Sequence, residues 1–375
     1  SPVVMVPKKD GTQRFCVDFR KVNSISKFDA YPMARINDII DRLGRARYLS
    51  KIDLTRGYWQ VPLSEETKKK TAFTTPAGLY EFTTMPFGLH GAPATFQRMM
   101  DRILQGTEEF AAALMDDIII FSETWDEHLE HVREVLERLR IAGLTARPSK
   151  CSLGMDEVVY LGYVVGGGKV KPTESKVETV KEFPRPKTKT DVRAFLGLSG
   201  YYRKFIPNYA SDLTRKAAPQ IISLTNQCSR AFVELKDRLC SLPVLRSPDL
   251  SKPFVVQTDA SESGIGAVLS QEGPDGEHPV AYISRKLRPR ESRYATIEKE
   301  CLAIVWAVQT LRVYLFGQCF TIQTDHHPLQ WLQQMKDKNS RLTRWSLSLQ
   351  PYKFKINHRK GKENINADTL SILLP

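Results

Sequence analysis

The chain between residues 111 and 122 reads AAALMDDIIIFS, two apolar runs joined by Asp116 and Asp117. Apolar runs around a two-residue polar tip predict a buried β-hairpin with the acidic pair at its turn. Such turns favour Asn-Gly or Asp-Gly because they need positive φ, and two adjacent carboxylates repel each other. The pair therefore predicts a divalent cation, since Mg²⁺ binds carboxylate oxygens together with phosphates.

A third carboxylate, Asp53, ends the apolar strand predicted over residues 48–53, YLSKID. If this strand lies beside the hairpin, Asp53 joins Asp116 and Asp117 at one metal site. Taken alone, the acidic pair is equally compatible with a surface turn, and Asp53 is a weaker signal still. The choice between the two interpretations depends on the surrounding sequence.

Two further blocks flank these acids. Residues 6–20, VPKKDGTQRFCVDFR, predict a basic hairpin around an Asp-Gly turn, and residues 85–97, MPFGLHGAPATFQ, predict a Pro/Gly-punctuated loop that runs into a helix. In this order, the blocks and the acids resemble the reverse transcriptases of gypsy-type LTR retrotransposons, over essentially the whole chain. The resemblance implies an α/β and α+β multidomain protein: a right-hand polymerase followed by an RNase H-like domain.

Length, charge and cysteine use agree with this interpretation. A chain of 375 residues is long enough for two or three domains, and its net charge of +13 favours a polyanionic partner. Six cysteines show no metal-binding spacing, which predicts reduced thiols in the cytosol. We find no signal peptide and no apolar stretch long enough for a membrane span, so no membrane partner is expected.

The sequence punctuation predicts three regions. Residues 1–165 are expected to be mixed α/β, with helices near 35–43, 91–105 and 124–143, and the resemblance implies that they form fingers and palm. Residues 166–250 become helical and Pro-interrupted, and resemble the thumb and connection of the family. The segment at 209–219 is shorter than is usual in the family, which puts its packing in doubt. Residues 251–375 are expected to form the third region, the RNase H-like domain.

The third region repeats the pattern of scattered acids. Strands predicted over 253–259, 264–269, 278–285 and 319–324, with a helix over 293–315, give a βββαβ order. Four acids end strands or border helices in the order Asp, Glu, Asp, Asp: Asp259, Glu298, Asp325 and Asp368. Any one of them could be a helix cap or a solvated charge, and Asp368 alone fits a helix N-terminus. Their joint order on this frame is similar to ribonuclease H.

The chemistry implied by the resemblance explains why both regions rely on carboxylates. Two Mg²⁺ ions per site, with Mn²⁺ as a substitute, serve phosphoryl transfer on nucleic acids. Asp53 and Asp116 are expected to bridge the polymerase ions, with Asp117 as an electrostatic support. The four acids of the third region are expected to hold the ions of the nuclease site: Asp259, Glu298, Asp325 and Asp368.

The resemblance also assigns nucleotide-binding residues. Lys8 and Arg14 match the family's triphosphate clamp, and Arg suits phosphate geometry. Tyr58 matches the bulky residue that excludes a ribose 2′-hydroxyl, and Phe87 and Gly88 border the nucleotide and template. The alternatives are solvated charges for the basic pair and a core tyrosine for Tyr58.

Several other features carry less information. The pair His326-His327 lacks further ligands for zinc. His358 is either a mobile histidine that assists product release or a solvated one. Arg203 and Lys204 are candidate contacts to a duplex backbone. Leu114 stands where the family usually has an aromatic, and Ile372 where it has a basic residue, which leaves open whether this copy is fully active.

The expected function is RNA-directed DNA polymerase with ribonuclease H activity. Its partners would be an RNA template, a DNA primer, RNA–DNA hybrid and dNTPs, in a cytoplasmic virus-like particle or, with the element, in the nucleus. The chain begins at Ser1 without an initiator Met, so we expect a piece of a longer polyprotein. The resemblance implies a protease before it and an integrase after it. A homo-oligomer is left open. The alternative is a domesticated or decayed copy that binds nucleic acid without catalysis; an RNA-dependent RNA polymerase would lack the RNase H-like region.

Overall fold

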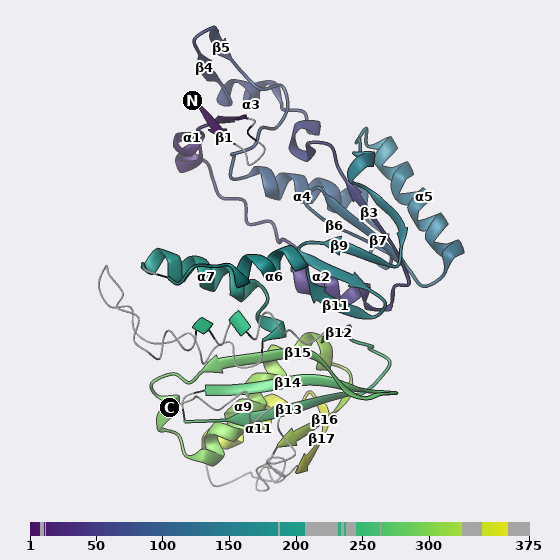
Figure 1. The fold of residues 1–375 in the computed structure, drawn as a ribbon, viewed down its shortest axis with the longest axis vertical. Helices are drawn as coiled ribbons and strands as arrows, with labels where there is room; N and C mark the ends of the chain where they lie inside the picture. The colour runs from purple at the N-terminus through teal and green to yellow at the C-terminus, as the bar shows by residue number, and fades with distance from the viewer. Residues whose placement is uncertain are drawn as a thin grey trace. The chain divides into compact units, whose positions relative to one another are not determined.

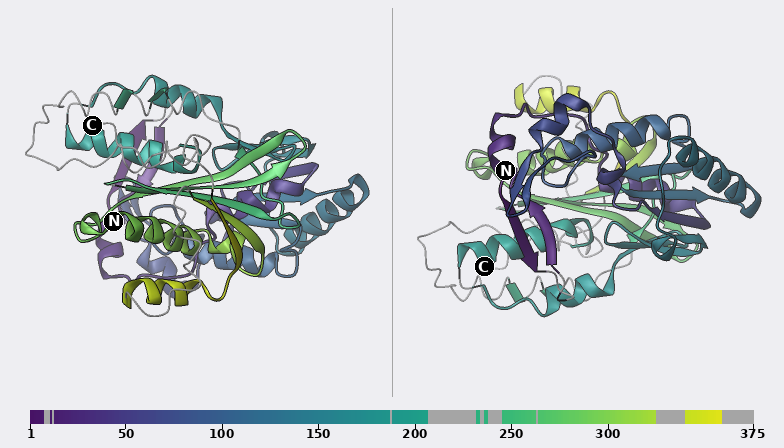
Figure 2. Two further views of the ribbon diagram at one scale, coloured as in Figure 1. Left: turned by 90° about the horizontal axis from the view of Figure 1, so that it is seen from below. Right: turned by 90° about the horizontal axis from the view of Figure 1, so that it is seen from above.

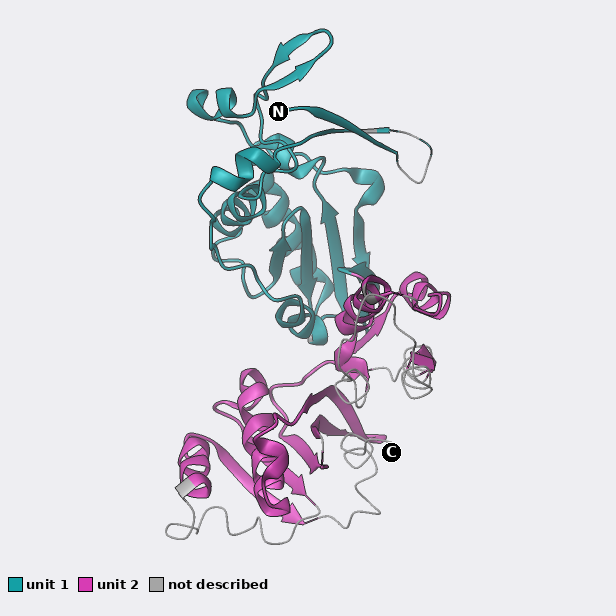
Figure 3. Cartoon of the chain, turned by 90° about the vertical axis from the view of Figure 1, so that its left-hand side faces the viewer, with its two compact units in different colours: residues 1–161, 165–168 teal, residues 162–164, 169–375 magenta. Residues whose placement is uncertain are grey.

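The computed structural model describes residues 1–7, 11, 13–186, 188–206, 232–233, 236–237, 245–262, 264–324 and 340–358 (Figure 1). The chain divides into two compact units (Figure 3). Unit 1 comprises residues 1–161 and 165–168, and unit 2 comprises residues 162–164 and 169–375. The expected division into three regions, with boundaries at 165 and 250, stays a prediction. In the described part of the chain, no helix combines the length and apolar character that a membrane span needs.

Unit 1 is built around a four-stranded antiparallel sheet in the order β6-β7-β3-β8. These strands are β6 (Ala111–Leu114), β7 (Asp117–Ser122), β3 (Tyr48–Asp53) and β8 (Ser152–Met155). The helix α4 (Ala92–Ile103) packs against β6, and α5 (Trp125–Ile141) packs against β7 and β3. Apolar side chains from the sheet and both helices form one core, including Ile118, Phe96 and Val135.

The remaining elements of unit 1 include two small two-stranded hairpins. These remaining elements are β1 (Val3–Pro7), β2 (Gln13–Val17), α1 (Arg20–Ile25), α2 (Ile36–Arg42), η1 (Leu43–Arg45), η2 (Gly57–Gln60), α3 (Glu65–Lys70), β4 (Phe73–Thr75), β5 (Gly78–Tyr80), η3 (Pro148–Lys150) and β9 (Glu157–Tyr160). The strands β1 and β2 pair antiparallel, as the basic hairpin prediction required.

The acidic hairpin forms, but its turn lies one residue earlier than expected. Leu114 ends β6 and pairs with Asp117, which begins β7, so the two turn residues are Met115 and Asp116. The prediction of Asp116-Asp117 as the tip was therefore wrong by one position. Met115 makes this turn possible by adopting a left-handed φ of 56°, a conformation that costs a non-glycine residue about 1–2 kcal/mol.

The N-terminal part of unit 2 is small and mainly helical. The strand β10 (Tyr163–Gly166) spans the division between the units, and β11 (Lys169–Pro172) pairs with β12 (Leu245–Arg246). Between them lie α6 (Glu174–Lys181), α7 (Lys189–Tyr201) and η4 (Arg203–Phe205). Stacked aromatic rings fix this part: the Tyr163 ring centroid lies 5.4 Å from that of Tyr201 and 5.8 Å from that of Phe205. The segment at 209–219 lies outside the described residues.

The rest of unit 2 is a five-stranded sheet in the order β15-β14-β13-β16-β17. Its strands are β13 (Phe254–Ala260), β14 (Gly264–Gly273), β15 (Gly276–Lys286), β16 (Cys319–Thr324) and β17 (Lys353–His358). The first three pair antiparallel, whereas β16 pairs parallel with both β13 and β17. The helix α9 (Thr296–Thr310) packs on β13 and β14, and α11 (Ser340–Leu349) packs on α9 (Figure 2).

The predicted βββαβ order is present, with one difference in the helix. The helix expected over 293–315 is broken into η5 (Glu291–Arg293), α9 and α10 (Arg312–Leu315). Leu311 separates α9 from α10, and it is buried in the core between the helices and the sheet. The buried face of α9 supplies Cys301, Ile304, Val308 and other apolar side chains to that core.

Candidate active site

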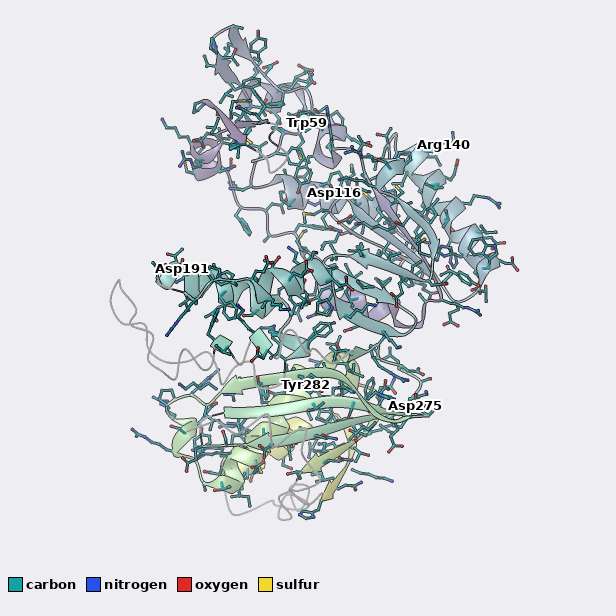
Figure 4. All side chains as sticks on the ribbon, in the orientation of Figure 1. Trp59, Asp116, Arg140, Asp191, Asp275 and Tyr282 are labelled. Carbon is teal, nitrogen blue, oxygen red and sulfur yellow. The ribbon has the colours of Figure 1, made fainter. Side chains whose placement is uncertain are left out.

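Three carboxylates gather at one end of the unit 1 sheet. Asp53 is the last residue of β3 and lies directly opposite Asp117, the first residue of β7. Asp116 occupies the turn between β6 and β7 (Figure 4), and its backbone C=O accepts the N–H of Leu54 at 3.1 Å. The sheet register therefore brings together three acids that are more than 60 residues apart at the extremes of the sequence.

Two lysines neutralise two of these acids. Lys51 Nζ lies 3.0 Å from Asp117 Oδ1, and Lys150 Nζ lies 3.6 Å from Asp53 Oδ2. Although the Asp116 side chain reaches solvent, the protein atoms packed around it desolvate the carboxyl group and raise its pKa. The negative charges of Asp117 and Asp53 raise the same pKa further. Ionisation of Asp116 is therefore less favourable than that of a fully solvated aspartate.

The donor set fits a divalent cation chemically. All three side chains offer oxygen ligands, which Mg²⁺ prefers, and a cation would offset the repulsion between them. Within the described residues, however, no group of three or more His, Cys, Asp and Glu side chains has a spacing that could hold a metal ion. Metal binding here is therefore a proposal, and any ligand role of Asp53 and Asp117 competes with their lysine contacts.

Aromatic side chains line the neighbourhood of the turn. The Tyr58 hydroxyl donates to Met115 Sδ at 3.5 Å, and the Tyr58 ring centroid lies 5.1 Å from that of Phe87 and 5.4 Å from that of Phe96. Phe87 is 54% exposed. Gly88 has a φ of 98°, and its C=O accepts the side-chain amide of Asn23 at 2.8 Å. The structure thus places Tyr58 and Phe87 together beside the residue that precedes Asp116.

Sequence reasoning missed the role of Gly57. A Cβ atom at this position would lie 2.9 Å from Asp116 Cβ and 3.2 Å from Phe96 Cζ, so any side chain would displace the acid. Gly57 is buried and begins η2 directly before Tyr58. The only sequence signal was a glycine four residues after Asp53, which many loops would show.

The two described candidate acids of unit 2, Asp259 and Glu298, differ in secondary structure, burial and bonding partners. Asp259 lies in β13 and is 6% exposed. Glu298 sits in the first turn of α9, where its Oε2 accepts the Ala295 backbone N–H at 3.1 Å. Its Oε1 accepts Arg341 Nη1 at 2.9 Å. Glu298 thus closes the start of its helix and joins α9 to α11, and its assignment as a metal ligand stays a prediction.

Glu300, which the sequence analysis did not select, is the more deeply buried acid of α9, at 4% exposure. It precedes Ala303 and Ile304 by about one turn, so it lies on the helix face that packs on the sheet. Ala303 shares a cluster with Ile265 and with Ala260, the residue after Asp259. The helical spacing of 300, 304, 307 and 308 was the signal available in the sequence.

Several predicted site residues cannot be placed. Lys8, Asp325 and Asp368 lie outside the described residues, as do His326 and His327. Arg14 lies in β2, but its side chain is outside the described part. His358 ends β17, opposite Thr324 of β16. Leu114, the departure from the family pattern, is buried at the end of β6.

Comparison with known proteins identifies two domains in the chain. Residues 6–165 match the family described as "Reverse transcriptase (RNA-dependent DNA polymerase)", and residues 249–352 match the "RNase H-like domain found in reverse transcriptase". The Retrovirus-related Pol polyprotein from transposon 297 of Drosophila melanogaster is 43% identical over 383 residues, which cover 99% of this chain and 36% of the relative. The Pol polyprotein from transposon gypsy of the same species is 38% identical over 395 residues, 99% of this chain and 38% of the relative.

The chain thus spans little more than a third of the length of these relatives. Among solved structures, the foamy viral protease-reverse transcriptase in complex with dsDNA is similar with a TM-score of 0.82 at 25% identity. That similarity covers 96% of this chain and 77% of the other, and it confirms the expected fold class. Residues 6–165 thus match a reverse transcriptase domain and residues 249–352 an RNase H-like domain, and the chain as a whole is similar to the Pol polyproteins of gypsy-type LTR retrotransposons.

Proposed function

We propose that this chain copies retroelement RNA into DNA and degrades the RNA strand of the resulting hybrid. The observation that carries the proposal is the gathering of Asp53, Asp116 and Asp117 at one sheet end, in a chain whose residues 6–165 match a reverse transcriptase domain. The neighbouring Tyr58 and Phe87 support it, because an aromatic surface beside the acids suits a nucleotide.

In the polymerase site, Asp53 and Asp116 would hold two Mg²⁺ ions, for which Mn²⁺ could substitute. When bound, such ions activate the attacking primer 3′-oxygen and stabilise the leaving pyrophosphate. Asp117, paired with Lys51, would support the charge of the site without being its main ligand. Tyr58 would occupy the volume of a ribose 2′-hydroxyl, and Lys8 and Arg14 would bind the triphosphate of the incoming dNTP.

In the nuclease site, Asp259, Asp325 and Asp368 would hold two further ions so that water cleaves the RNA strand. The fourth acid is either Glu298, the residue that the family order suggested, or Glu300. Glu300 is favoured by its burial on the face of α9 that packs on the sheet containing β13, the strand of Asp259. The Glu298 carboxylate accepts the Ala295 N–H at the start of α9 and pairs with Arg341.

The partners of the whole protein belong to the same proposal. The structural relative solved with dsDNA supports a duplex as ligand, and the net charge of +13 suits it. The names of the relatives support synthesis as part of a Pol polyprotein. A protease before this segment and an integrase after it would be parts of the same polyprotein. The site of action would be a cytoplasmic virus-like particle or the nucleus, and a homo-oligomer is left open.

Primer extension on an RNA template, with Mg²⁺ and with EDTA, tests the proposal. We expect dNTP-dependent extension in Mg²⁺ and none in EDTA, and cleavage of the RNA strand of a preformed hybrid under the same conditions. Hybrid binding measured in parallel by fluorescence anisotropy serves as the control. Binding without either reaction in Mg²⁺ or Mn²⁺ would instead support the rival interpretation, a non-catalytic nucleic-acid-binding copy.

A further inference from the structure

The side chain of Gln97 reaches the acidic turn from the neighbouring helix. Gln97 lies in α4 and is 1% exposed. Its Oε1 accepts the Met115 backbone N–H at 2.8 Å, and its Nε2 donates to the Ala113 backbone C=O at 3.0 Å. The same Nε2 donates to Asp101 Oδ1 at 2.8 Å. Both amide hydrogens and the amide oxygen of Gln97 are therefore engaged.

This amide has only one workable orientation. If its oxygen and nitrogen were exchanged, a donor would face the Met115 N–H and an acceptor would face both the Ala113 C=O and Asp101. A carboxylate at this position could still accept from Met115, but it would repel Ala113 and Asp101. Glutamine is thus the one side chain of this length that meets all three partners.

The backbone that Gln97 holds is the part of the hairpin that carries Asp116. Ala113 lies near the end of β6, and Met115 is the turn residue with a φ of 56°. A non-glycine residue in this region is held there by its surroundings. Gln97 bonds both sides of Leu114 and fixes the N–H of the strained residue directly before the acid.

Gln97 is itself fixed by a chain of contacts that leads away from the turn. Asp101 accepts the Tyr31 hydroxyl at its Oδ2 at 2.6 Å while its Oδ1 accepts Gln97. Arg98 Nη2 donates to both oxygens of Asp29, at 2.9 and 2.7 Å, and its guanidinium lies 4.7 Å from the centre of the Tyr31 ring. The segment 29–31 is thereby joined to α4, and through Asp101 and Gln97 to the turn.

We propose that Gln97 is a positioning residue of the polymerase site, which sets the backbone of the Met115-Asp116 turn, and that Asp101 and Tyr31 orient its amide. Gln97 touches no substrate; it acts through the backbone that presents Asp116. This inference rests on the proposed polymerase function. It predicts that substitutions that remove these hydrogen bonds slow nucleotide addition, most at Gln97, less at Asp101 and least at Tyr31.

The test compares single-nucleotide addition by the full chain and its variants. Gln97→Glu should lower kcat about 10- to 100-fold with the dNTP KM changed little, because a misplaced acid slows the chemical step. Asp101→Ala should lower kcat about 3- to 10-fold, and Tyr31→Phe about 2- to 5-fold, as expected for the loss of one hydrogen bond each. Gln105→Glu is the matched control: the same change at an exposed position close to the end of α4, with activity unchanged.

A rescue separates positioning from simple loss of structure. Adding Asp101→Asn to Gln97→Glu supplies an amide donor to the new carboxylate, and kcat should recover several-fold over Gln97→Glu alone. Hybrid cleavage by unit 2 should stay at the wild-type level throughout. If Gln97→Glu does not fold, Asp101→Ala carries the test, since Asp101 is exposed.

The two proposals fail in different ways. If the wild-type chain does not extend a primer, the proposed function is wrong. If it extends a primer and Gln97→Glu or Asp101→Ala keeps the wild-type kcat, this inference alone is wrong. A parallel fall of extension and hybrid cleavage, together with the thermal midpoint, would also overturn it, because that result marks a purely structural role.

Discussion

The two proposed acidic sites carry their carboxylates on different kinds of element. In unit 1, Asp53 and Asp117 are opposite residues on adjacent strands, so the sheet register alone sets their separation. In unit 2, Asp259 is on a strand whereas Glu298 and Glu300 are on a helix. In a strand, each side chain lies on one of two faces of the sheet. A helix turns by about 100° per residue, so Glu298 and Glu300, two positions apart, lie on different faces of α9.

The basic residues that pair with the acids also differ between the two units. Lysines from β3 and η3 neutralise two acids of unit 1. In unit 2, Arg341 pairs with Glu298, and its guanidinium lies 4.0 Å from the centre of the Tyr294 ring. The place of a strand-end acid therefore follows from the order of the strands in the sequence, whereas the place of a helix acid depends on its burial and partners.

The largest expected effect tests whether the sites are independent. Asp116→Asn should lower primer extension by about 10³-fold or more and leave hybrid cleavage nearly intact, because it removes one anionic ligand from the polymerase site. Asp259→Asn should do the converse. Both activities are measured on the same preparations, with circular dichroism as a check of folding. Loss of both activities in a folded single variant would contradict two separate sites.

The second prediction decides between the two acids of α9. Glu300→Ala should lower hybrid cleavage by about 100-fold, because it removes a carboxylate from the proposed metal site. Glu298→Ala should keep most cleavage but destabilise the protein by about 1 kcal/mol through the lost helix cap, a fall in thermal midpoint of about 2–4 °C. If Glu298→Ala abolished cleavage and Glu300→Ala kept it, Glu298 would be the acid of the nuclease site.

The third prediction concerns the close approach of Gly57 to Asp116. Gly57→Ala introduces a Cβ atom 2.9 Å from Asp116 Cβ, so the acid must move. We expect primer extension to fall about 10- to 100-fold with hybrid cleavage unchanged. Gly91→Ala is the matched control, since a Cβ atom there meets nothing within 4 Å. Equal activity of the Gly57→Ala variant and the wild type would show that the Met115-Asp116 turn can shift without loss of primer extension.

The fourth prediction concerns sugar selection in unit 1. Tyr58→Val should raise CTP incorporation relative to dCTP by about tenfold, equivalent to about 1.4 kcal/mol of transition-state free energy, because it opens the volume of a 2′-hydroxyl. Tyr58→Phe retains the ring and loses only the bond to Met115 Sδ, so its ratio should stay near that of the wild type. Single-nucleotide addition on one primer measures both. An unchanged ratio in Tyr58→Val would make Tyr58 a packing residue.

The smallest effect concerns the pH dependence of stability. His128 is 1% exposed and lies between Ser50 Oγ, 2.7 Å from its Nε2, and Ser122 Oγ, 3.0 Å from its Nδ1. Burial, and next the nearby His131, lower the pKa of His128 below the ordinary value of 6.5. His128 therefore takes up a proton near pH 6.5 in the unfolded chain but only at a lower pH in the folded chain. Its contribution to the free energy of unfolding is fully present above pH 6.5 and is lost as the pH falls toward the lowered pKa.

The thermal midpoint of the full chain, measured between pH 7.5 and about 5, checks this expectation. For one titrating group, the free energy of unfolding changes by at most about 1.4 kcal/mol per pH unit. His128→Gln removes the titrating group and should flatten that part of the curve. Identical curves for the variant and the wild type would show that His128 contributes no pH dependence.

The apolar runs made most of unit 1 predictable. The strand over 48–53 and the acidic hairpin formed where their pattern placed them, since alternation and apolar length decide which segments enter a buried sheet. The turn was misplaced by one residue because Met115 accepts a positive φ that propensity would give to Gly or Asn. The contacts of Gly57 and Gln97 could not be predicted, because both involve residues remote in the chain.

The sequence alone predicted the order of the described strands and helices, the place of Asp53 at the end of its strand and the resemblance to a known family. These features depend on local pattern, which each segment carries alone. Only the tertiary structure decided which helix acid is buried, which lysine neutralises which carboxylate and which amide holds the turn of Asp116. Those properties depend on the distance and solvent exposure between side chains of different segments, and packing alone sets both.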